Sequence, residues 1–235
     1  VACPVAADGS PVRPVFSWQD ARTGDEVEEL GRVISAEQYY EQNGLPLGTT
    51  WIVTKILWMR KHEPDLLAKT ARFVQNHDLV LRAFGADDFY TDLCCAVFYG
   101  VWDVHRADWN LPLLERLDLR PEQFGRPTLP GTCVGKIERA VAERTGFAAG
   151  TPLCVGAGDQ NCSVLGMGAI QPGLATVTLG TAGLAILATE RPLAGFGGMM
   201  ITHHAAPGMW EVECLSNAAA ASLRWYRDVI ATSEK

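Results

Sequence analysis

The pattern of apolar residues changes near Gly150, and this change constrains the fold more than any other feature. Before it, apolar residues recur at helical spacing, as in the segment that follows Pro64. After it, short apolar runs alternate with glycines, as in residues 151–158 and 174–180, which is typical of strands. The sequence therefore predicts a mixed α/β structure.

Helix signals occupy most of the first part of the chain. Pro64 is suited to a first helical position, and Gly146 is suited to a C-terminal cap. Residues 43–46 form a helix-breaking segment, and residues 1–18 read as a strand, a turn at residues 8–11 and a second strand. The predicted helices are residues 24–42, two helices within residues 54–74 with Val74 on the second, residues 111–119, residues 136–144, and residues 217–234 capped by Ser216 or Asn217.

The same change of texture predicts a domain junction near residue 166. Residues 1–166 are expected to form one domain that lacks its first part, and residues 167–235 are expected to begin a second. The chain opens without an initiator methionine, so we expect it to begin within a domain.

Charge and hydropathy exclude several classes of protein. A net charge of −7 and a pI near 5.2 disfavour a nucleic-acid surface, which needs clustered Lys and Arg. An apolar run of about 18 residues would be needed to span a bilayer, and the sequence has none and no secretory leader. A cytoplasmic protein is expected.

The seven cysteines show no CxxC spacing, which argues against a zinc site or a disulfide framework. Several lie in apolar runs such as CCAVF and PLCVG, so they are expected to be small buried side chains in a reducing compartment. No metal site is predicted.

The most informative segment is residues 153–160, LCVGAGDQ, an apolar strand that ends in small residues and a carboxylate. In layered α/β proteins ligands lie beyond the carboxyl ends of strands, so Asp159 is placed as a catalytic acid or base is. Gly156 and Gly158 would let a ligand approach the backbone. The alternative is that Asp159 only caps a helix that starts near Asn161.

A second glycine-rich turn follows in the strand-like sequence VTLGTAGLAI. Backbone N–H groups around Gly180 and Gly183, together with the Thr181 hydroxyl, can hold phosphate oxygens without a charged side chain. An ordinary β-hairpin with a glycine-rich connection is the alternative.

The order and separation of short motifs along nearly the whole chain resemble the FGGY carbohydrate kinases. GAGDQ is similar to the turn that carries the catalytic Asp in this family, and LGTAG is similar to its phosphate-contacting turn. The other matching segments are Trp18-x-Asp20-x-Arg22, Thr54-Lys55 with Trp58, Asp78, Thr91-Asp92, Trp109, and the segment Ser222 to Asp228, which is similar to the helix that borders the nucleotide in glycerol kinases.

The resemblance implies an actin-like, ribonuclease H-like ATPase fold: a sugar-binding domain and an ATP-binding domain, both incomplete here, with a cleft between them. It implies transfer of a phosphoryl group from ATP, with Mg²⁺, to a hydroxyl of a small sugar or polyol, and a xylulose-like ketose is favoured. A homodimer stays open. The implied roles are the general base for Asp159, sugar binding for Trp18, Asp20 and Gln160, and nucleotide binding for Gly180, Thr181 and Gly183.

Blander alternatives accompany these roles. Trp18 could be a core aromatic, and Asp20 with Arg22 could form a structural ion pair near the surface. Ala220 stands where relatives often have glycine, so it is not assigned a nucleotide contact.

Two motifs that should flank this segment are absent from it: an Asp-x-Gly-Thr phosphate loop before it and a glycine-rich adenine-site motif after it. We therefore expect the 235 residues alone to be inactive and a longer parent chain to be active. The rival hypothesis is a sugar-binding or regulatory protein that kept the fold and lost catalysis.

A structural role is expected for His203 and His204, and His77 is expected to be a surface or cleft residue. His203 and His204 are predicted at a strand end, without metal ligands near them in sequence. His77 and Asp78 are neighbours in sequence, and adjacent residues on a helix seldom face each other, so no base-and-orienter pair is predicted there.

Overall fold

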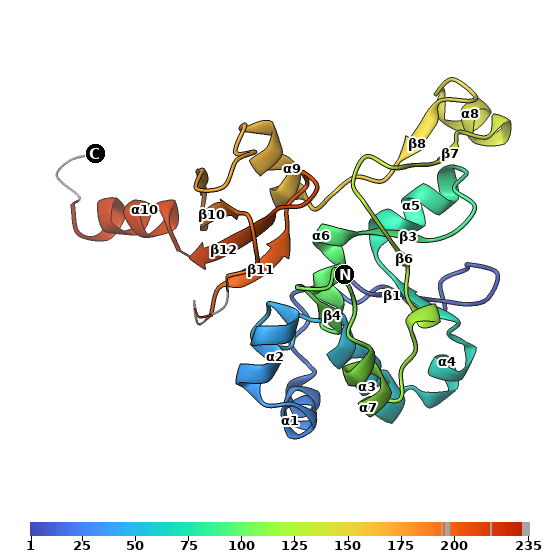
Figure 1. Ribbon diagram of the computed structural model, residues 1–235, viewed down its shortest axis with the longest axis horizontal. Coiled ribbons are helices and arrows are strands. Elements are labelled where there is room, and N and C mark those ends of the chain that lie inside the picture. Colours follow the sequence, from blue (N-terminus) through green and yellow to red (C-terminus); the bar gives the residue numbers. More distant parts are fainter. Residues whose placement is uncertain (194, 196–197, 217, 232–235) are drawn as a thin grey trace.

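The computed structural model describes residues 1–193, 195, 198–216 and 218–231. It is a mixed α/β structure, as the sequence predicts, and it has two parts (Figure 1). We call residues 1–155 the first lobe and the described residues from 159 onward the second lobe. Among the residues described, no helix is long and apolar enough to cross a membrane.

The first lobe is rich in helices joined by short strand pairs. β1 pairs with β2 in antiparallel fashion, and β3 pairs with β6 in parallel. Its elements are β1 (Cys3–Val5), α1 (Gly24–Val33), α2 (Ala36–Asn43), α3 (Ile52–His62), α4 (Pro64–Lys69), β2 (Arg72–Val74), α5 (Asn76–Phe84), β3 (Tyr90–Asp92), α6 (Leu93–Ala96), η1 (Val97–Tyr99), β4 (Trp102–Asp103), β5 (Asp108–Trp109), α7 (Leu111–Arg116), η2 (Pro121–Gln123), β6 (Arg126–Thr128), β7 (Cys133–Lys136), α8 (Arg139–Thr145) and β8 (Pro152–Cys154).

The second lobe is a four-stranded antiparallel sheet in the order β11-β12-β10-β9, with a helix at each end of its sequence. Figure 1 shows α9 at the junction of the lobes and α10 projecting beyond the sheet. The elements are α9 (Asp159–Gly166), β9 (Ala175–Leu179), β10 (Gly183–Thr189), β11 (Met200–His203), β12 (Trp210–Ser216) and α10 (Ala220–Val229).

The first lobe contains the main hydrophobic core. Trp109 packs edge-to-face against both Tyr99 and Trp102, with ring centroids 5.2 Å apart in each pair. Leu30 and Ile56 are buried in the same cluster. Aromatic side chains bury large areas, so this cluster is the principal source of stability for the lobe.

Direct hydrogen bonds join the two lobes. The Ile201 amide donates to the Gly44 carbonyl at 2.7 Å, and the Trp102 indole donates to His203 Nε2 at 3.0 Å. Gly44 has φ of +71°, and a Cβ there would lie 2.5 Å from the Ile201 carbonyl oxygen. Glycine is therefore required at this helix end both by its backbone conformation and by the neighbouring lobe.

Several predicted helix bounds are corrected. The segment 24–42 is two helices, because Ser35 caps a new helix by accepting the Gln38 amide at 3.2 Å. Val74 lies in β2 and not on a helix. Residues 133–136 form a strand before α8, α7 ends at Arg116, and α10 begins at Ala220, with Ser216 still in β12 and Asn217 outside the described residues.

Candidate functional site

Asp159 lies where the chain passes from the first lobe to the second. β8 ends at Cys154, and α9 begins at Asp159 with Gly158 as its N-terminal flanking residue. The Asp159 side chain is exposed, and its Oδ1 accepts the Gln160 amide at 2.9 Å. The capping alternative places the helix start near Asn161, with Asp159 before the helix. In the structure the helix starts at Asp159, so Asp159 is its first residue.

Gly158 and Asn161 fix this junction. A Cβ on Gly158 would lie 2.4 Å from Asn161 Oδ1, so the close approach excludes other side chains. Asn161 Nδ2 donates to Glu211 Oε2 at 2.8 Å and to the His203 carbonyl at 3.1 Å. Because both partners belong to the second-lobe sheet, Asn161 attaches the helix that carries Asp159 to that sheet.

Two buried glutamates on β12 lie behind the junction, and sequence reasoning missed them. Burial raises the pKa of Glu211 and of Glu213 to about 7, and for Glu213 the negative charge of Asp159 adds to the effect. The sequence signal for these two residues is the alternation of glutamate with apolar residues in WEVEC, because residues two apart on a strand share a face.

His204 Nε2 lies 3.5 Å from Glu211 Oε1, within ion-pair distance. Burial lowers the pKa of His204 while it raises the pKa of Glu211. Both shifts favour the uncharged form of the group, which weakens the ion pair. His203 lies at the end of β11, as predicted, and burial lowers its pKa to about 4.

The expectation that His77 does not face Asp78 is wrong. His77 Nε2 lies 3.1 Å from Asp78 Oδ1 and 3.1 Å from Asp92 Oδ2. Burial acts to lower the pKa of His77, but the two carboxylates outweigh it and the pKa is raised. The Gln75 amide, at the N-terminus of α5, donates to Asp78 Oδ2 at 2.9 Å. This hydrogen bond orients the Asp78 carboxylate so that Oδ1 faces the imidazole.

Cys95 completes this cluster, in which Asp92 and Cys95 are buried and His77 is half-buried. Ligand-type atoms of His77, Asp92 and Cys95 lie within 4.8 Å of one another. Cys95 Sγ would lie 3.4 Å from a Cβ on Gly158, so the cluster lies directly beneath the Asp159 turn. Imidazole and thiolate suit transition metals, whereas Mg²⁺ prefers oxygen ligands, so these residues do not fit the Mg²⁺ of a nucleotide site.

The predicted sugar-binding residues of the first lobe are at its surface. The Trp18 side chain is 59% exposed, which contradicts a core aromatic. Asp20 forms the ion pair considered from the sequence, with Arg22 Nε 2.9 Å from Asp20 Oδ2, and the hydrogen bond from Arg22 lowers the pKa of Asp20. The buried Lys55 ammonium donates to the Asp20 and Thr49 carbonyls, so it fixes the backbone of this loop.

The turn at residues 180–182 connects β9 and β10 as a hairpin. The Gly180 amide donates to the Ala182 carbonyl at 2.9 Å within the turn. The Gly180 and Thr181 carbonyls accept the Ala220 and Ala219 amides at 3.0 Å each, so the turn occupies the N-terminus of α10. A Cβ on Gly183 would lie 2.8 Å from the Ala219 Cβ, which makes Gly183 a packing position. Thr181 is exposed in this turn.

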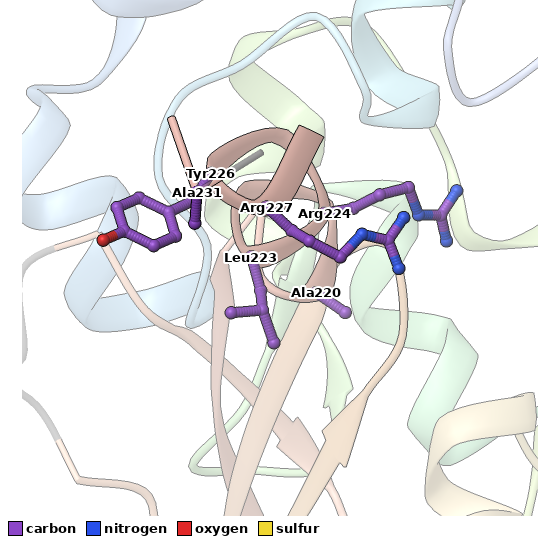
Figure 2. A pocket seen from close by; sticks show the side chains of 6 residues that line it. All are labelled: Ala220, Leu223, Arg224, Tyr226, Arg227 and Ala231. Atoms are coloured by element: carbon purple, nitrogen blue, oxygen red, sulfur yellow. The ribbon is translucent and has the colours of Figure 1, made fainter. Parts of the chain in front are cut away.

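The structure thus builds three separate groups: the Asp159 turn, the Trp18–Asp20 loop, and the turn at residues 180–182. Among the described residues, no hydrogen bond or ion pair joins one group to another. A surface hollow lies along α10 and its end, and Figure 2 shows Arg224 and Arg227 extending to one side of this helix and Tyr226 to the other. It does not include Asp159.

Comparison with known proteins identifies the family. The sequence model of the FGGY family of carbohydrate kinases, N-terminal domain, matches residues 2–166, so the chain belongs to this family. An autoinducer-2 kinase from Klebsiella pneumoniae subsp. pneumoniae is 29% identical over 224 residues, which cover 92% of this chain and 41% of that protein.

Solved structures show the same fold at lower identity. A xylulose kinase from Rhodospirillum rubrum is 23% identical with a TM-score of 0.89, over 98% of this chain and 47% of that one. Plasmodium falciparum glycerol kinase with ADP is 17% identical with a TM-score of 0.84, over 97% of this chain and 46% of that one. The chain therefore spans less than half the length of each of these three proteins.

Proposed function

We propose that the chain is the central part of a kinase that transfers the γ-phosphoryl group of ATP to a hydroxyl of a small sugar or polyol, with Asp159 as general base. The observation that carries this proposal is the position of Asp159. Its carboxylate is exposed at the first residue of α9, the helix that opens the second lobe and is hydrogen-bonded to the sheet of that lobe. A base between two lobes can meet a substrate held by both.

In this mechanism Asp159 takes the proton of the acceptor hydroxyl while the hydroxyl oxygen attacks the γ-phosphorus and ADP leaves. Oδ1 accepts the Gln160 amide, which orients the carboxylate and leaves Oδ2 to accept the substrate proton. Phosphoryl transfer depends mainly on positioning, so one oriented carboxylate suffices on the acceptor side.

On the sugar side, Trp18 would pack an apolar face of the substrate, and Asp20 and Gln160 would bond its hydroxyls. Asp20 retains a part-exposed side chain even while it is paired with Arg22. We assign residues 1–166, which are the first lobe together with α9, to the sugar-binding domain and the following residues to the start of the ATP-binding domain, and the extent of the family match supports this division.

On the nucleotide side, Gly180, Thr181 and Gly183 would form the turn that faces the phosphates. The amide of Gly180 is used within the turn, so we assign the direct contact to Thr181 and a shaping role to the two glycines. MgATP is the donor in this proposal, and the metal-ligand cluster found among the described residues, His77, Asp92 and Cys95, is separate from this turn.

A ketose such as xylulose is the favoured acceptor. The fold likeness to a xylulose kinase supports it, and the higher sequence identity to an autoinducer-2 kinase adds autoinducer-2 as a second candidate. ATP consumption by the full-length protein with xylulose, autoinducer-2, glycerol and gluconate would decide between them.

Asp159→Asn tests the assignment of the base. In the full-length protein we expect kcat to fall about 10²- to 10⁴-fold while sugar affinity stays within about twofold, because the amide keeps the shape and cannot take the proton. Asp108→Asn is the matched control, since Asp108 is also exposed and its Oδ1 also accepts the next amide, at 2.8 Å. Near-normal kcat for Asp159→Asn would overturn the proposal.

The rival hypothesis, a sugar-binding protein without catalysis, makes a different prediction. It requires sugar binding with no ATP consumption by the unaltered full-length protein, and it requires no Asp-x-Gly-Thr phosphate loop in the parent gene. ATP turnover that depends on Asp159 would exclude it.

A further inference from the structure

We infer that Cys133 and Cys154 form a dithiol site that a small disulfide, such as glutathione disulfide, oxidises to an intramolecular cross-strand disulfide. The two residues are direct partners in the antiparallel pair β7–β8, with the register Cys133↔Cys154. They are 21 positions apart in sequence, so no spacing motif shows the pair. This inference does not depend on the proposed kinase activity.

The register places the two side chains on the same face of the strand pair, directly before an irregularity in β7 between Cys133 and Gly135. The Val155 amide donates to the Thr132 carbonyl at 2.9 Å, so the ladder hydrogen bond lies at the neighbouring position. Bonded and non-bonded pairs alternate along an antiparallel ladder, which makes Cys133 and Cys154 a non-hydrogen-bonded pair, with Cα atoms about 4.5 Å apart. A disulfide accepts Cα separations of about 4.4–6.8 Å.

Both thiols are accessible. The side chains of Cys133 and Cys154 are exposed and in no disulfide, on the strand pair that carries α8 at the outer end of the first lobe (Figure 1). The Cys133 thiol donates to the Gly135 carbonyl at 3.4 Å, a weak hydrogen bond that oxidation would replace. The general expectation of buried cysteines is therefore wrong for these two, and also for Cys162 and Cys214. Cys214 lies opposite Ala185 on the sheet, so it has no thiol across the strand.

The chemistry balances with one small disulfide. A thiolate of the pair attacks one sulfur of the oxidant, forms a mixed disulfide and releases one small thiol. The second thiolate then attacks the protein sulfur of that mixed disulfide and releases the other small thiol. Two electrons and two protons pass from the cysteine pair to the oxidant, which is reduced to two thiols.

Oxidation would act on the segment that leads to Asp159. Val155 follows Cys154 directly and is already held by Thr132 and by the Gly131 amide, which donates to the Val155 carbonyl at 2.7 Å. A covalent bond at Cys154 would add to this attachment and hold β8 against β7. We therefore expect slower amide exchange across β7 and β8 in the oxidised protein.

The test equilibrates the full-length protein with mixtures of reduced and oxidised glutathione, followed by acid quench, alkylation and peptide mapping. We expect a peptide that links Cys133 to Cys154 and a loss of two hydrogens from the mass. Half-oxidation should occur at a glutathione disulfide fraction at least about tenfold lower than half-modification of Cys133→Ser or Cys154→Ser, because the second step is intramolecular in the unaltered protein.

The variants separate the outcomes. Cys133→Ser and Cys154→Ser should each stop at one glutathionyl group on the remaining thiol, and Cys214→Ser should leave the linked peptide unchanged. Independent glutathionylation of Cys133 and Cys154 without a link, or links only between molecules, would overturn the inference. So would an unmodified pair under conditions in which Cys214 is glutathionylated.

Discussion

The two lobes differ sharply in how much of their apolar surface they bury. The first lobe contains one large cluster that includes Leu30, Ile56 and Trp102, whereas the cluster that holds Val164, Leu184 and Ile186 in the second lobe is small. Several apolar residues of the second lobe are exposed to solvent: Val177, Leu179, Leu223 and Trp225 are 62%, 74%, 69% and 59% exposed. Burial of apolar surface drives folding, so the lobes should differ in local stability.

The difference also shows where the site gets its order. Asp159 is the first residue of α9 in the second lobe, but it comes shortly after strand β8 of the first lobe. It also lies above the cluster of His77, Asp92 and Cys95. The Asp159 turn is therefore joined to both lobes, to the first by the preceding strand β8 and to the second by the hydrogen bonds of Asn161.

The largest expected effect comes from the same substitution in each lobe. Leu30→Ala removes a fully buried side chain and should lower the free energy of unfolding by about 2–5 kcal/mol, whereas Leu179→Ala, at 74% exposed, should change it by less than about 0.5 kcal/mol. Urea unfolding followed by tryptophan fluorescence measures both. Equal effects would show that the lobes do not differ as their burial indicates.

A smaller loss is expected at the junction. Asn161→Ala leaves Glu211 Oε2 and the His203 carbonyl without their donor, which should cost about 1–3 kcal/mol. Hydrogen exchange should accelerate in α9 and leave α3 unchanged. Asn76→Ala, at an exposed position, is the control. Uniform acceleration in both lobes would mean that Asn161 does not act as a local attachment.

Glu213→Gln should change how stability depends on pH. The pKa of Glu213 is about 7 in the folded chain against an ordinary 4.5, so its contribution is full below about pH 4.5 and is lost as pH rises through 7. At pH 8 the Gln variant should be more stable than the unaltered protein by on the order of 1–3 kcal/mol, with little difference at pH 4.5.

Thermal or urea unfolding between pH 4.5 and 8.5 measures this difference. His203 acts in the opposite sense, because its lowered pKa costs stability as pH falls below about 6.5, and it contributes equally to both proteins. Glu115→Gln, at an exposed position on α7, is the control. A constant difference between Glu213→Gln and the unaltered protein at every pH would contradict the assignment.

The features that the sequence predicts well are local. Pro64 opens α4, and Gly44 and Gly146 end helices with φ of +71° and +79°, because these residues act through their own backbone geometry. The short apolar runs after Gly150 form strands β8, β9, β10 and β12, as their local pattern predicts.

The features that it misses depend on contacts distant in the chain. Val74 pairs with Cys3 in a strand, although its helical spacing from Leu67 is as good as that within α4. His77 and Asp92 meet through β3, and Cys133 meets Cys154 through β7–β8. The candidate site shows the same division. The exposed Asp159 turn is predicted from its local sequence, whereas Glu211, Glu213 and Cys95 come to lie near it only in the folded chain.

The smallest expected effect on stability distinguishes a binding residue from a packing residue. Trp18 and Trp225 are both 59% exposed, one on each lobe, so replacing either with Ala should change the free energy of unfolding by less than about 0.5 kcal/mol. Sugar affinity should separate them. Trp18→Ala should weaken sugar binding by about tenfold, since an aromatic face that packs a ligand contributes about 1 kcal/mol or more, while Trp225→Ala should leave it unchanged. Calorimetric titration of the full-length protein with xylulose, without nucleotide, makes the comparison, and equal affinities for the two variants would remove Trp18 from the sugar site.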